Sequence, residues 1–350
     1  MFSGNKDWGG LGPFALTGGG FIRHNLIMRK LKLPWLLPAL FFAGLSQAAA
    51  AVGKDYAYLL TGDPADAKVF PQGGAILEGG ADDSEEAIRW MIRRAVGGDI
   101  VVLRASEDEG TQEMFATLGK VDSVETFSFT SRVPAYDPFI LSKIDQADGI
   151  FFAGGDQAEY VSFWKHTPVQ EAVNRAIKRG VPVGGISAGL AILGQFQFEA
   201  LHDTVTSDEA LKDPYALAVT LGKDFLEVPQ LKGIITDSHF SQRGRLGRLL
   251  VFMSRLVQDG WTGEAKGIGV DEETAVLVDD FGAAVVTGKN NAVFVRLSRK
   301  PLVCRPGEPL TAGAFEVVTA ASGQRFNVKT WEGEGRSGLV DVKKGVLTAR

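Results

Sequence analysis

Apolar residues fall along the chain in short blocks that predict strands and helices in alternation. Continuous apolar runs indicate strands, and apolar residues at helical spacing indicate the helices between them, one of which begins after Ser84 as its N-cap. The strands are predicted at residues 56–60, 99–103, 123–129, 149–153 and 181–184, and further helices at 111–118, 138–144, 169–178 and 246–257. Strands that are apolar throughout are typical of a parallel sheet covered on both faces, so the pattern predicts an α/β fold.

Three segments depart from this alternation. Residues 73–80 are predicted to be a glycine-rich loop, and residues 195–232 an insertion. Beyond residue 267 the pattern predicts strands alone, at 267–271, 275–278, 283–286 and 292–297. We therefore expect a central α/β domain over residues 52–297 and a β-rich C-terminal extension over residues 298–350.

The N-terminal segment has the order of a secretory signal peptide. A basic start at residues 28–32 precedes an apolar stretch at 34–45 and small residues at 48–50. Residues 1–27 show no pattern of secondary structure, so we expect that they are an N-terminal extension assigned in error and that translation starts at Met28. A signal peptide is then expected over residues 28–51. The apolar core is short for a membrane span, so we expect a secreted or periplasmic protein without stable membrane insertion, a retained anchor being the alternative.

Charge and composition narrow the function classes. The chain of 350 residues holds 37 basic and 42 acidic side chains, and without the first 50 residues the balance is 32 to 41, which disfavours nucleic acid as the main partner. Cys304, the one cysteine, allows no disulfide and no cysteine-based zinc site, and its apolar run 301–304 indicates a packing role. The histidines lack the spacing of a helical metal site, so neither a metal nor a cofactor is predicted.

The sequence Gly185-Ile186-Ser187-Ala188-Gly189 lies between an apolar strand and an apolar helical run. This is the context of a nucleophile elbow, in which a sharp turn holds the serine in a strained conformation above the carboxyl edge of the sheet. The flanking glycines remove side chains that would collide in such a turn. Ser187 is therefore the predicted nucleophile, and the alternative is a structural turn with Ser187 as a helix N-cap.

A serine nucleophile needs a base and an acid. His239 follows a strand-like run and precedes the long helix, which favours it over His202, while His166 is the weakest candidate. The acidic run 271–273 ends the next strand and could orient the imidazole, or form a solvated turn. An ordinary α/β-hydrolase has its histidine last, so the order serine, histidine, acid indicates a different fold.

Two further segments carry groups for substrate. Gly154-Gly155 ends a strand, where backbone N–H groups can approach a substrate carbonyl, and Asp156 and Gln157 follow as helix-capping residues that could touch substrate. Three arginines lie near the start of the long helix and suit a carboxylate-bearing substrate: Arg243, Arg245 and Arg248. For Arg245 and Arg248 the alternative is a role in surface salt bridges.

These motifs together resemble the cyanophycinase family and its relatives, the α-aspartyl dipeptidases. Four segments occur in the family's order, and the resemblance covers about residues 55–295. They are Phe152–Gln157, Gly185–Gly189, Asp237–Leu249 and Gly267–Ala275.

The resemblance implies a flavodoxin-like, mostly parallel sheet related to class I glutamine amidotransferases. It implies a serine peptidase whose substrate is a poly-aspartate backbone with arginine on each side chain, cleaved to β-Asp-Arg dipeptides. A homodimer is kept as a hypothesis. Matched by motif, the triad is Ser187, His239 and Glu272, the oxyanion amides are those of Gly155 and Ala188, and the substrate contacts are Gln157, Asp237 and Arg243.

Three positions depart from the family pattern. Ser238 stands where the family usually has Gln, Ile186 where Thr is common, and Leu190 where Ala is common. These changes leave the triad intact and raise the question of a different substrate pocket. A peptidase for other aspartyl or isoaspartyl peptides and an inactive binding protein on the same scaffold therefore remain open, with an esterase or lipase as a third alternative.

Overall fold

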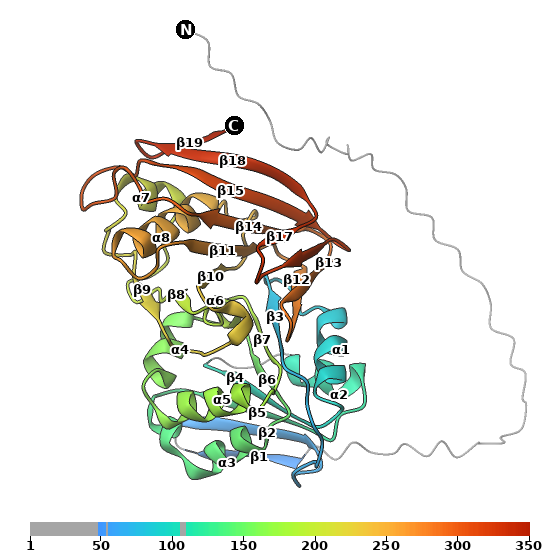
Figure 1. Cartoon of the computed structure of the whole chain (residues 1–350). Coiled ribbons are helices and arrows are strands. Elements are labelled where there is room, and N and C mark those ends of the chain that lie inside the picture. The colour runs from blue at the N-terminus through green and yellow to red at the C-terminus, as the bar shows by residue number, and fades with distance from the viewer. Residues whose placement is uncertain (1–47, 54, 106–109) are drawn as a thin grey trace, which may run out of the picture. The chain divides into compact units, whose positions relative to one another are not determined.

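The computed structural model describes residues 48–53, 55–105 and 110–350 (Figure 1). The predicted extension 1–27 lies outside the described residues, and so does the predicted signal peptide except for residues 48–51. Those four residues belong to β1, which pairs antiparallel with β2. Within the described chain, no helix is long and apolar enough to cross a lipid bilayer.

The secondary structure alternates as expected up to the long helix and is mainly β thereafter. The helices are α1 (Glu85–Arg94), α2 (Thr111–Leu118), η1 (Val133–Tyr136), α3 (Pro138–Gln146), α4 (Gln157–Trp164), α5 (Pro168–Lys178), α6 (Ala188–Ala191), α7 (Ser207–Lys212), η2 (Pro229–Leu231) and α8 (Leu246–Gln258). The strands are β1 (Ala48–Gly53), β2 (Tyr56–Gly62), β3 (Gly74–Glu78), β4 (Asp99–Arg104), β5 (Ser123–Phe129), β6 (Gly149–Phe152), β7 (Val183–Ile186), β8 (Phe196–Phe198), β9 (Leu221–Lys223), β10 (Ile234–Asp237), β11 (Ala265–Val270), β12 (Thr274–Asp279), β13 (Ala283–Gly288), β14 (Asn291–Leu297), β15 (Ala312–Ala321), β16 (Arg325–Asn327), β17 (Glu332–Gly333), β18 (Arg336–Lys343) and β19 (Val346–Ala349).

The first sheet has a parallel centre with antiparallel strands on both sides. Its order is β1-β2-β5-β4-β6-β7-β3-β12-β13-β16-β17, and the five strands from β5 to β3 run parallel. The prediction of a loop over residues 73–80 is wrong, because β3 lies inside this sheet between β7 and β12 and is buried along its whole length. Glycines at both ends of this segment concealed its short apolar centre.

The second sheet is also mixed, in the order β19-β18-β15-β14-β11-β10-β8-β9. Strands β8, β10 and β11 run parallel, and the other neighbours are antiparallel. The segment 195–232, expected as an insertion, supplies β8 and β9 at the edge of this sheet. The α/β class is confirmed, and the expected mostly parallel sheet is refined to two mixed sheets with parallel centres.

The C-terminal region is rich in strands, as predicted, and these strands enter both sheets. Strands β15, β18 and β19 extend the second sheet, while β16 and β17 extend the first. The run 301–304 makes only an isolated bridge, between Val303 and Thr311. Cys304 is buried in the core beside the second sheet, which confirms its packing role, and burial raises the pKa of its thiol to about 12.

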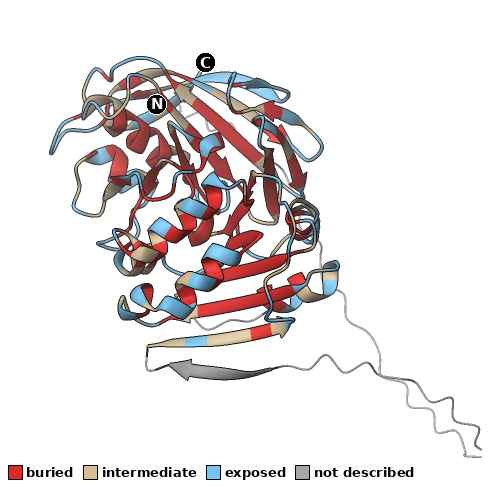
Figure 2. Cartoon of the chain, turned by 60° about the horizontal axis from the view of Figure 1, so that its bottom comes forward, coloured by how far each residue is buried: buried red, intermediate tan, exposed pale blue. Residues whose placement is uncertain are grey.

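Helices cover both faces of the first sheet (Figure 1), and its central strands are coloured as buried (Figure 2). Successive residues of a strand point to opposite faces of the sheet. In β4, Ile100 and Val102 pack with Met91 of α1 and with α2, while Val101 and Leu103 face α3, α4 and α5. The predicted cap of α1 is confirmed, because Ser84 Oγ accepts a hydrogen bond from the Ala87 amide at 3.3 Å. Hydrophobic cores on both faces of the first sheet, and a third beside the second sheet, therefore hold the strand ends that carry the candidate site.

Candidate active site

Three side chains predicted from the sequence form one hydrogen-bonded line. Ser187 Oγ lies 2.7 Å from His239 Nε2, and His239 Nδ1 lies 2.7 Å from Glu272 Oε1. Ser187 follows β7, His239 follows β10 and Glu272 follows β11. Strands of two different sheets thus bring together residues that are far apart in the sequence.

The backbone of Ser187 is strained in the manner of a nucleophile elbow. Its φ is 55° and its ψ is −110°. Its side chain makes no hydrogen bond to the first turn of α6, so the alternative of a structural helix N-cap is not supported. A Cβ on Gly185 would lie 2.4 Å from the carbonyl carbon of Gly189, and one on Gly189 would lie 2.0 Å from the Phe152 oxygen. The glycines are therefore required for α6 to pack so closely behind the serine.

A short backbone segment at the end of β3 holds two members of the line and the neighbour of the third. The carbonyl of Glu78 accepts from the Ser187 amide at 3.0 Å, that of Gly79 from the His239 amide at 2.7 Å, and that of Gly80 from the Glu273 amide at 2.9 Å. The sequence interpretation missed this role of Glu78–Gly80. The signal available was a pair of glycines directly after a short apolar run.

Glu272 is the member of the acidic run 271–273 that reaches the imidazole. Its backbone is fixed on both sides, because its amide donates to Gln242 at 3.0 Å and its carbonyl accepts from Asn290 at 2.9 Å. Asp271 is buried and accepts from backbone amides, and Glu273 pairs with Lys289. The three acids therefore have three different partners.

The surroundings of His239 favour a neutral imidazole. Burial lowers its pKa below the ordinary value of 6.5, and the nearby charges of Arg243 and Arg245 lower it further, while the hydrogen bond to Glu272 opposes them. A carboxylate only accepts hydrogen bonds, so Nδ1 carries the proton and Nε2 is left to accept from the Ser187 hydroxyl. This is the tautomer that a general base requires.

Two backbone amides next to Ser187 are available to a ligand. Gly155 is exposed with a φ of 152°, and a Cβ on the preceding Gly154 would be 3.9 Å from the Ser187 Cβ. Ala188 is the first residue of α6. No described residue accepts a hydrogen bond from the amide of Gly155 or Ala188. Their position matches the prediction of an oxyanion site, which stays a prediction.

The arginines after His239 have unequal environments. Arg248 is buried and donates to both carboxylate oxygens of Asp237, at 2.8 and 2.5 Å, and Arg245 donates to the Ser238 carbonyl at 2.8 Å. Burial lowers the pKa of Arg245 to about 10. These two arginines are therefore not in surface salt bridges, whereas Arg243 is exposed.

The predicted substrate contacts also differ in accessibility. Gln157 is half-buried at the first position of α4, after Asp156, which caps that helix. Asp237 is only 3% exposed and its carboxylate is occupied by Arg248. Direct contact of Asp237 with substrate therefore stays a prediction that its burial does not favour.

The departures from the family pattern lie mostly in packing positions. Ile186 and Leu190 are buried in hydrophobic cores, on opposite sides of the first sheet. Ser238 is buried next to Arg245. Of the three, only Ser238 lies among the charged groups beside His239.

The rival histidines take no part in this arrangement. His202 and His166 are exposed, and neither makes a described contact with Ser187 or His239. Among the residues that the structure describes, no group of His, Cys, Asp and Glu side chains has the geometry to hold a metal ion. The geometry therefore favours His239 as the partner of Ser187.

Comparisons with known proteins point to one family. Residues 108–286 match the profile of Peptidase family S51. A cyanophycinase of Trichormus variabilis is 26% identical over 220 residues, or 61% of this chain and 68% of that protein. A cyanophycinase of Geminocystis herdmanii is 25% identical over 279 residues, or 75% of this chain and 96% of that protein.

A solved structure supports the fold. The crystal structure of a peptidase from an acI-B1 Actinobacterium matches with a TM-score of 0.50 and 15% identity, covering 74% of this chain and 98% of that one. The family profile spans more than half of this chain and includes Ser187, His239 and Glu272. The chain therefore belongs to peptidase family S51, as a cyanophycinase-like, serine-type peptidase.

Proposed function

We propose that this peptidase cleaves aspartyl peptide bonds through an acyl-enzyme formed on Ser187. The observation that carries the proposal is the unbroken line from Ser187 through His239 to Glu272, with 2.7 Å at each step. Such a line couples a nucleophile to a base and the base to an orienting acid.

The first half of the reaction forms the acyl-enzyme. His239 Nε2 takes the hydroxyl proton as Ser187 Oγ attacks the carbonyl carbon of an aspartyl residue, and Glu272 stabilises the charged imidazole. The amides of Gly155 and Ala188 receive the developing oxyanion, and the loss of one such donor typically costs on the order of 10²–10³ in rate. His239 then gives its proton to the leaving amine as the peptide bond breaks.

The second half releases the product. Water enters in place of the amine and gives a proton to His239 while its oxygen attacks the ester carbonyl. The ester bond to Ser187 Oγ breaks, and Oγ recovers the proton from His239. The cycle consumes one water and leaves the three side chains in their starting states.

Cyanophycin is the substrate that we propose, with β-Asp-Arg dipeptides as the product. Curated relatives named cyanophycinase match this chain over 61 to 75% of its length. The exposed Arg243 lies close enough to lower the pKa of His239, so a substrate carboxylate bound there would lie beside the reacting groups. Gln157, at the start of α4, would contact the same substrate.

Export is part of the proposal. The basic start, apolar stretch and small residues before residue 52 support a signal peptide and a secreted or periplasmic enzyme. An enzyme placed there would act on polymer outside the cytoplasm.

A peptidase for other aspartyl or isoaspartyl peptides is the second candidate. Ser238 favours it, because a short side chain stands beside Arg245 and His239 where the family usually has Gln. The inactive binding protein is less favoured, since the complete Ser187-His239-Glu272 line has the geometry of a working triad.

The experiment compares the full-length protein with its Ser187→Ala variant on purified cyanophycin, with soluble products identified by mass spectrometry. We expect β-Asp-Arg from the wild type and none from the variant. Ser298→Ala, which removes an exposed hydroxyl, is the matched control and should behave as wild type. Release by Ser187→Ala would overturn the mechanism, and a wild type that cleaves only other aspartyl peptides would establish the second candidate.

A further inference from the structure

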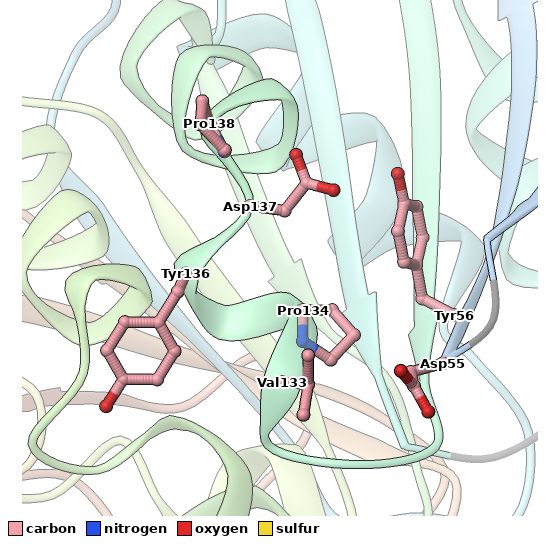
Figure 3. Close-up of a pocket in the computed structure, with 7 residues that line it drawn as sticks. All are labelled: Asp55, Tyr56, Val133, Pro134, Tyr136, Asp137 and Pro138. Atoms are coloured by element: carbon pink, nitrogen blue, oxygen red, sulfur yellow. The ribbon is translucent and has the colours of Figure 1, made fainter.

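A pocket of about 490 Å³ opens at the surface beside β2 and η1 (Figure 3). None of its lining residues belongs to the candidate triad or to its oxyanion loop. The lining residues are Asp55, Tyr56, Val133, Pro134, Tyr136, Asp137 and Pro138. The function proposed above makes no use of this pocket.

The charge of the lining is negative. The Asp55 carboxylate accepts no hydrogen bond from a described residue, while the Asp55 backbone carbonyl accepts from the Thr130 hydroxyl at 2.8 Å. Asp137 uses one carboxylate oxygen to cap α3, accepting from the Phe139 amide at 2.8 Å. The described lining contains two carboxylates and neither lysine nor arginine. A cationic group entering the pocket would therefore meet two carboxylates and, among the described lining residues, no positive charge.

The remaining lining residues are two tyrosines, two prolines and Val133. Tyr136 is 54% exposed, and Tyr56 stands with its hydroxyl near Asp137 (Figure 3). Burial raises the pKa of Tyr56, and the charge of Asp137 raises it further, so the phenol stays neutral. A guanidinium is planar, pairs with carboxylates through two parallel hydrogen bonds and stacks on aromatic faces, whereas an ammonium does only part of this.

The pocket lies at the same edge of the first sheet as Ser187. Tyr56 pairs with Phe129, the last residue of β5, and η1 follows that end. From β7, which ends directly before Ser187, the order runs through β6, β4 and β5 to β2. Four steps of about 4.8 Å place the pocket about 19 Å from Ser187 along this edge.

Helix α4 bridges the same interval. It begins directly after the Gly154-Gly155 loop, and near its far end the Ser162 and Lys165 carbonyls accept from Arg132, the residue before η1, at 2.5 and 2.7 Å. A helix of this length spans about 12 Å. An extended peptide covers 19 Å with about six residues at about 3.3 Å each, so a bound polymer can reach both places.

We propose that this pocket is a second substrate site, which binds an arginine side chain about six residues from the bond being cleaved. The inference rests on the proposed function, because an arginine-bearing polymer supplies such a side chain at every position. Long chains then engage the catalytic centre and the pocket together, while fragments of two units engage the centre alone. The pocket acts on binding and leaves the chemical step unchanged.

The test measures binding by calorimetry in the full-length Ser187→Ala background. The ligand is a synthetic oligomer of ten aspartates carrying arginine on each side chain, and a second oligomer carries citrulline, the neutral isostere. The pocket variant is Asp55→Asn with Asp137→Asn, since asparagine retains the cap of α3. The control is Glu171→Gln with Glu227→Gln, exposed acids lining another surface pocket.

We expect the pocket variant to bind the arginine oligomer about tenfold more weakly, with the control within twofold of the parent. The citrulline oligomer should bind the parent and the pocket variant equally. Unchanged binding of the arginine oligomer by the pocket variant, or an equal loss with citrulline, would overturn the proposal. Tyr136→Ala, which removes an exposed ring, gives a second variant, and thermal unfolding checks that each is folded.

Activity assays separate this inference from the function on which it rests. In the Ser187 enzyme, the pocket variant should raise KM for the ten-unit oligomer relative to KM for a two-unit fragment, with kcat unchanged. A wild type that cleaves neither oligomer nor fragment would refute the proposed function, and calorimetry would still decide whether the pocket binds arginine.

Discussion

The imidazole of His239 lies against the backbone of Gly80, so closely that a Cβ on this glycine would be 2.3 Å from Cε1 of the ring. Gly80 also has a φ of 113°, which side chains rarely adopt. The next residue back, Gly79, accepts the hydrogen bond from the His239 amide. The position of the proposed base is therefore set by the absence of a side chain on β3's following loop.

Replacing Gly80 with alanine should impair catalysis through His239. We expect Gly80→Ala to lower kcat about 100-fold, because displacing a catalytic group by about 1 Å can cost that much. Gly233→Ala is the matched control, since its φ is 76° but a Cβ there meets nothing within 4 Å. The control should share the backbone strain, seen as a lower unfolding temperature, and keep its kcat. Equal kcat values for the two variants would refute this role of Gly80.

The acidic run offers a paired test of the orienting acid. Glu272→Gln should lower kcat by about 10²–10⁴-fold, because the amide neither fixes the imidazole tautomer nor stabilises its charged form. Glu273→Gln removes the same charge one residue away, where the carboxylate pairs with Lys289 at the surface. Steady-state kinetics should show the neighbour within about twofold of wild type. A comparable loss in both variants would point to general charge effects instead.

The low pKa of His239 predicts how activity depends on pH. The protonated imidazole cannot accept the serine proton, so kcat/KM should fall as pH drops through a pKa below 6.5. Arg243→Gln removes a nearby positive charge, which eases protonation and should move this acidic limb to higher pH. Arg305→Gln, whose arginine pairs with Glu308 on the surface, should leave the midpoint unchanged. A midpoint that stays fixed or moves to lower pH in Arg243→Gln would contradict the electrostatic origin.

The pair formed by Arg248 and Asp237 predicts a cost in stability. Arg248 is 2% exposed and lies over the ring of Phe198, so Arg248→Met would leave a buried carboxylate without its main partner. We expect the free energy of unfolding in urea to fall by about 3–5 kcal/mol. Arg296→Met breaks an exposed pair with Glu316 and should cost less than about 1 kcal/mol. Similar losses in both would mean that burial does not govern this pair.

Local patterns predicted most of the helices and strands because their signals are local. The predicted helix 111–118 and strand 123–129 coincide with α2 and β5, and the long amphipathic helix is α8. The partners of a strand in a sheet lie far away in the sequence, so the local pattern could not predict which strands pair. Nothing in the pattern of 74–78 shows that it lies between β7 and β12, because this place depends on residues about 100 and 200 positions away.

In the candidate site too, residues marked by a local pattern could be predicted, whereas contacts between distant segments could not. Ser187 could be found from its flanking glycines, and His239 and Glu272 from the strand ends that precede them. The burial of Asp237 could not be predicted, because it depends on Arg248 in the first turn of α8 and on the packing of that helix. The pocket beside Tyr56 was also missed, since its two carboxylates are separated by more than 80 residues and meet only through the pairing of β2 with β5.

The division of the last strands between two sheets has a consequence for the order of folding. Strands β16 and β17 complete one sheet, while β15 and β18, on either side of them in sequence, complete the other. Neither sheet is complete until the strands from residue 312 onward have paired, and such long-range pairings form slowly. Until residues 312–343 are in place, both sheets therefore lack outer strands, although the three residues of the proposed triad all precede this stretch in the sequence.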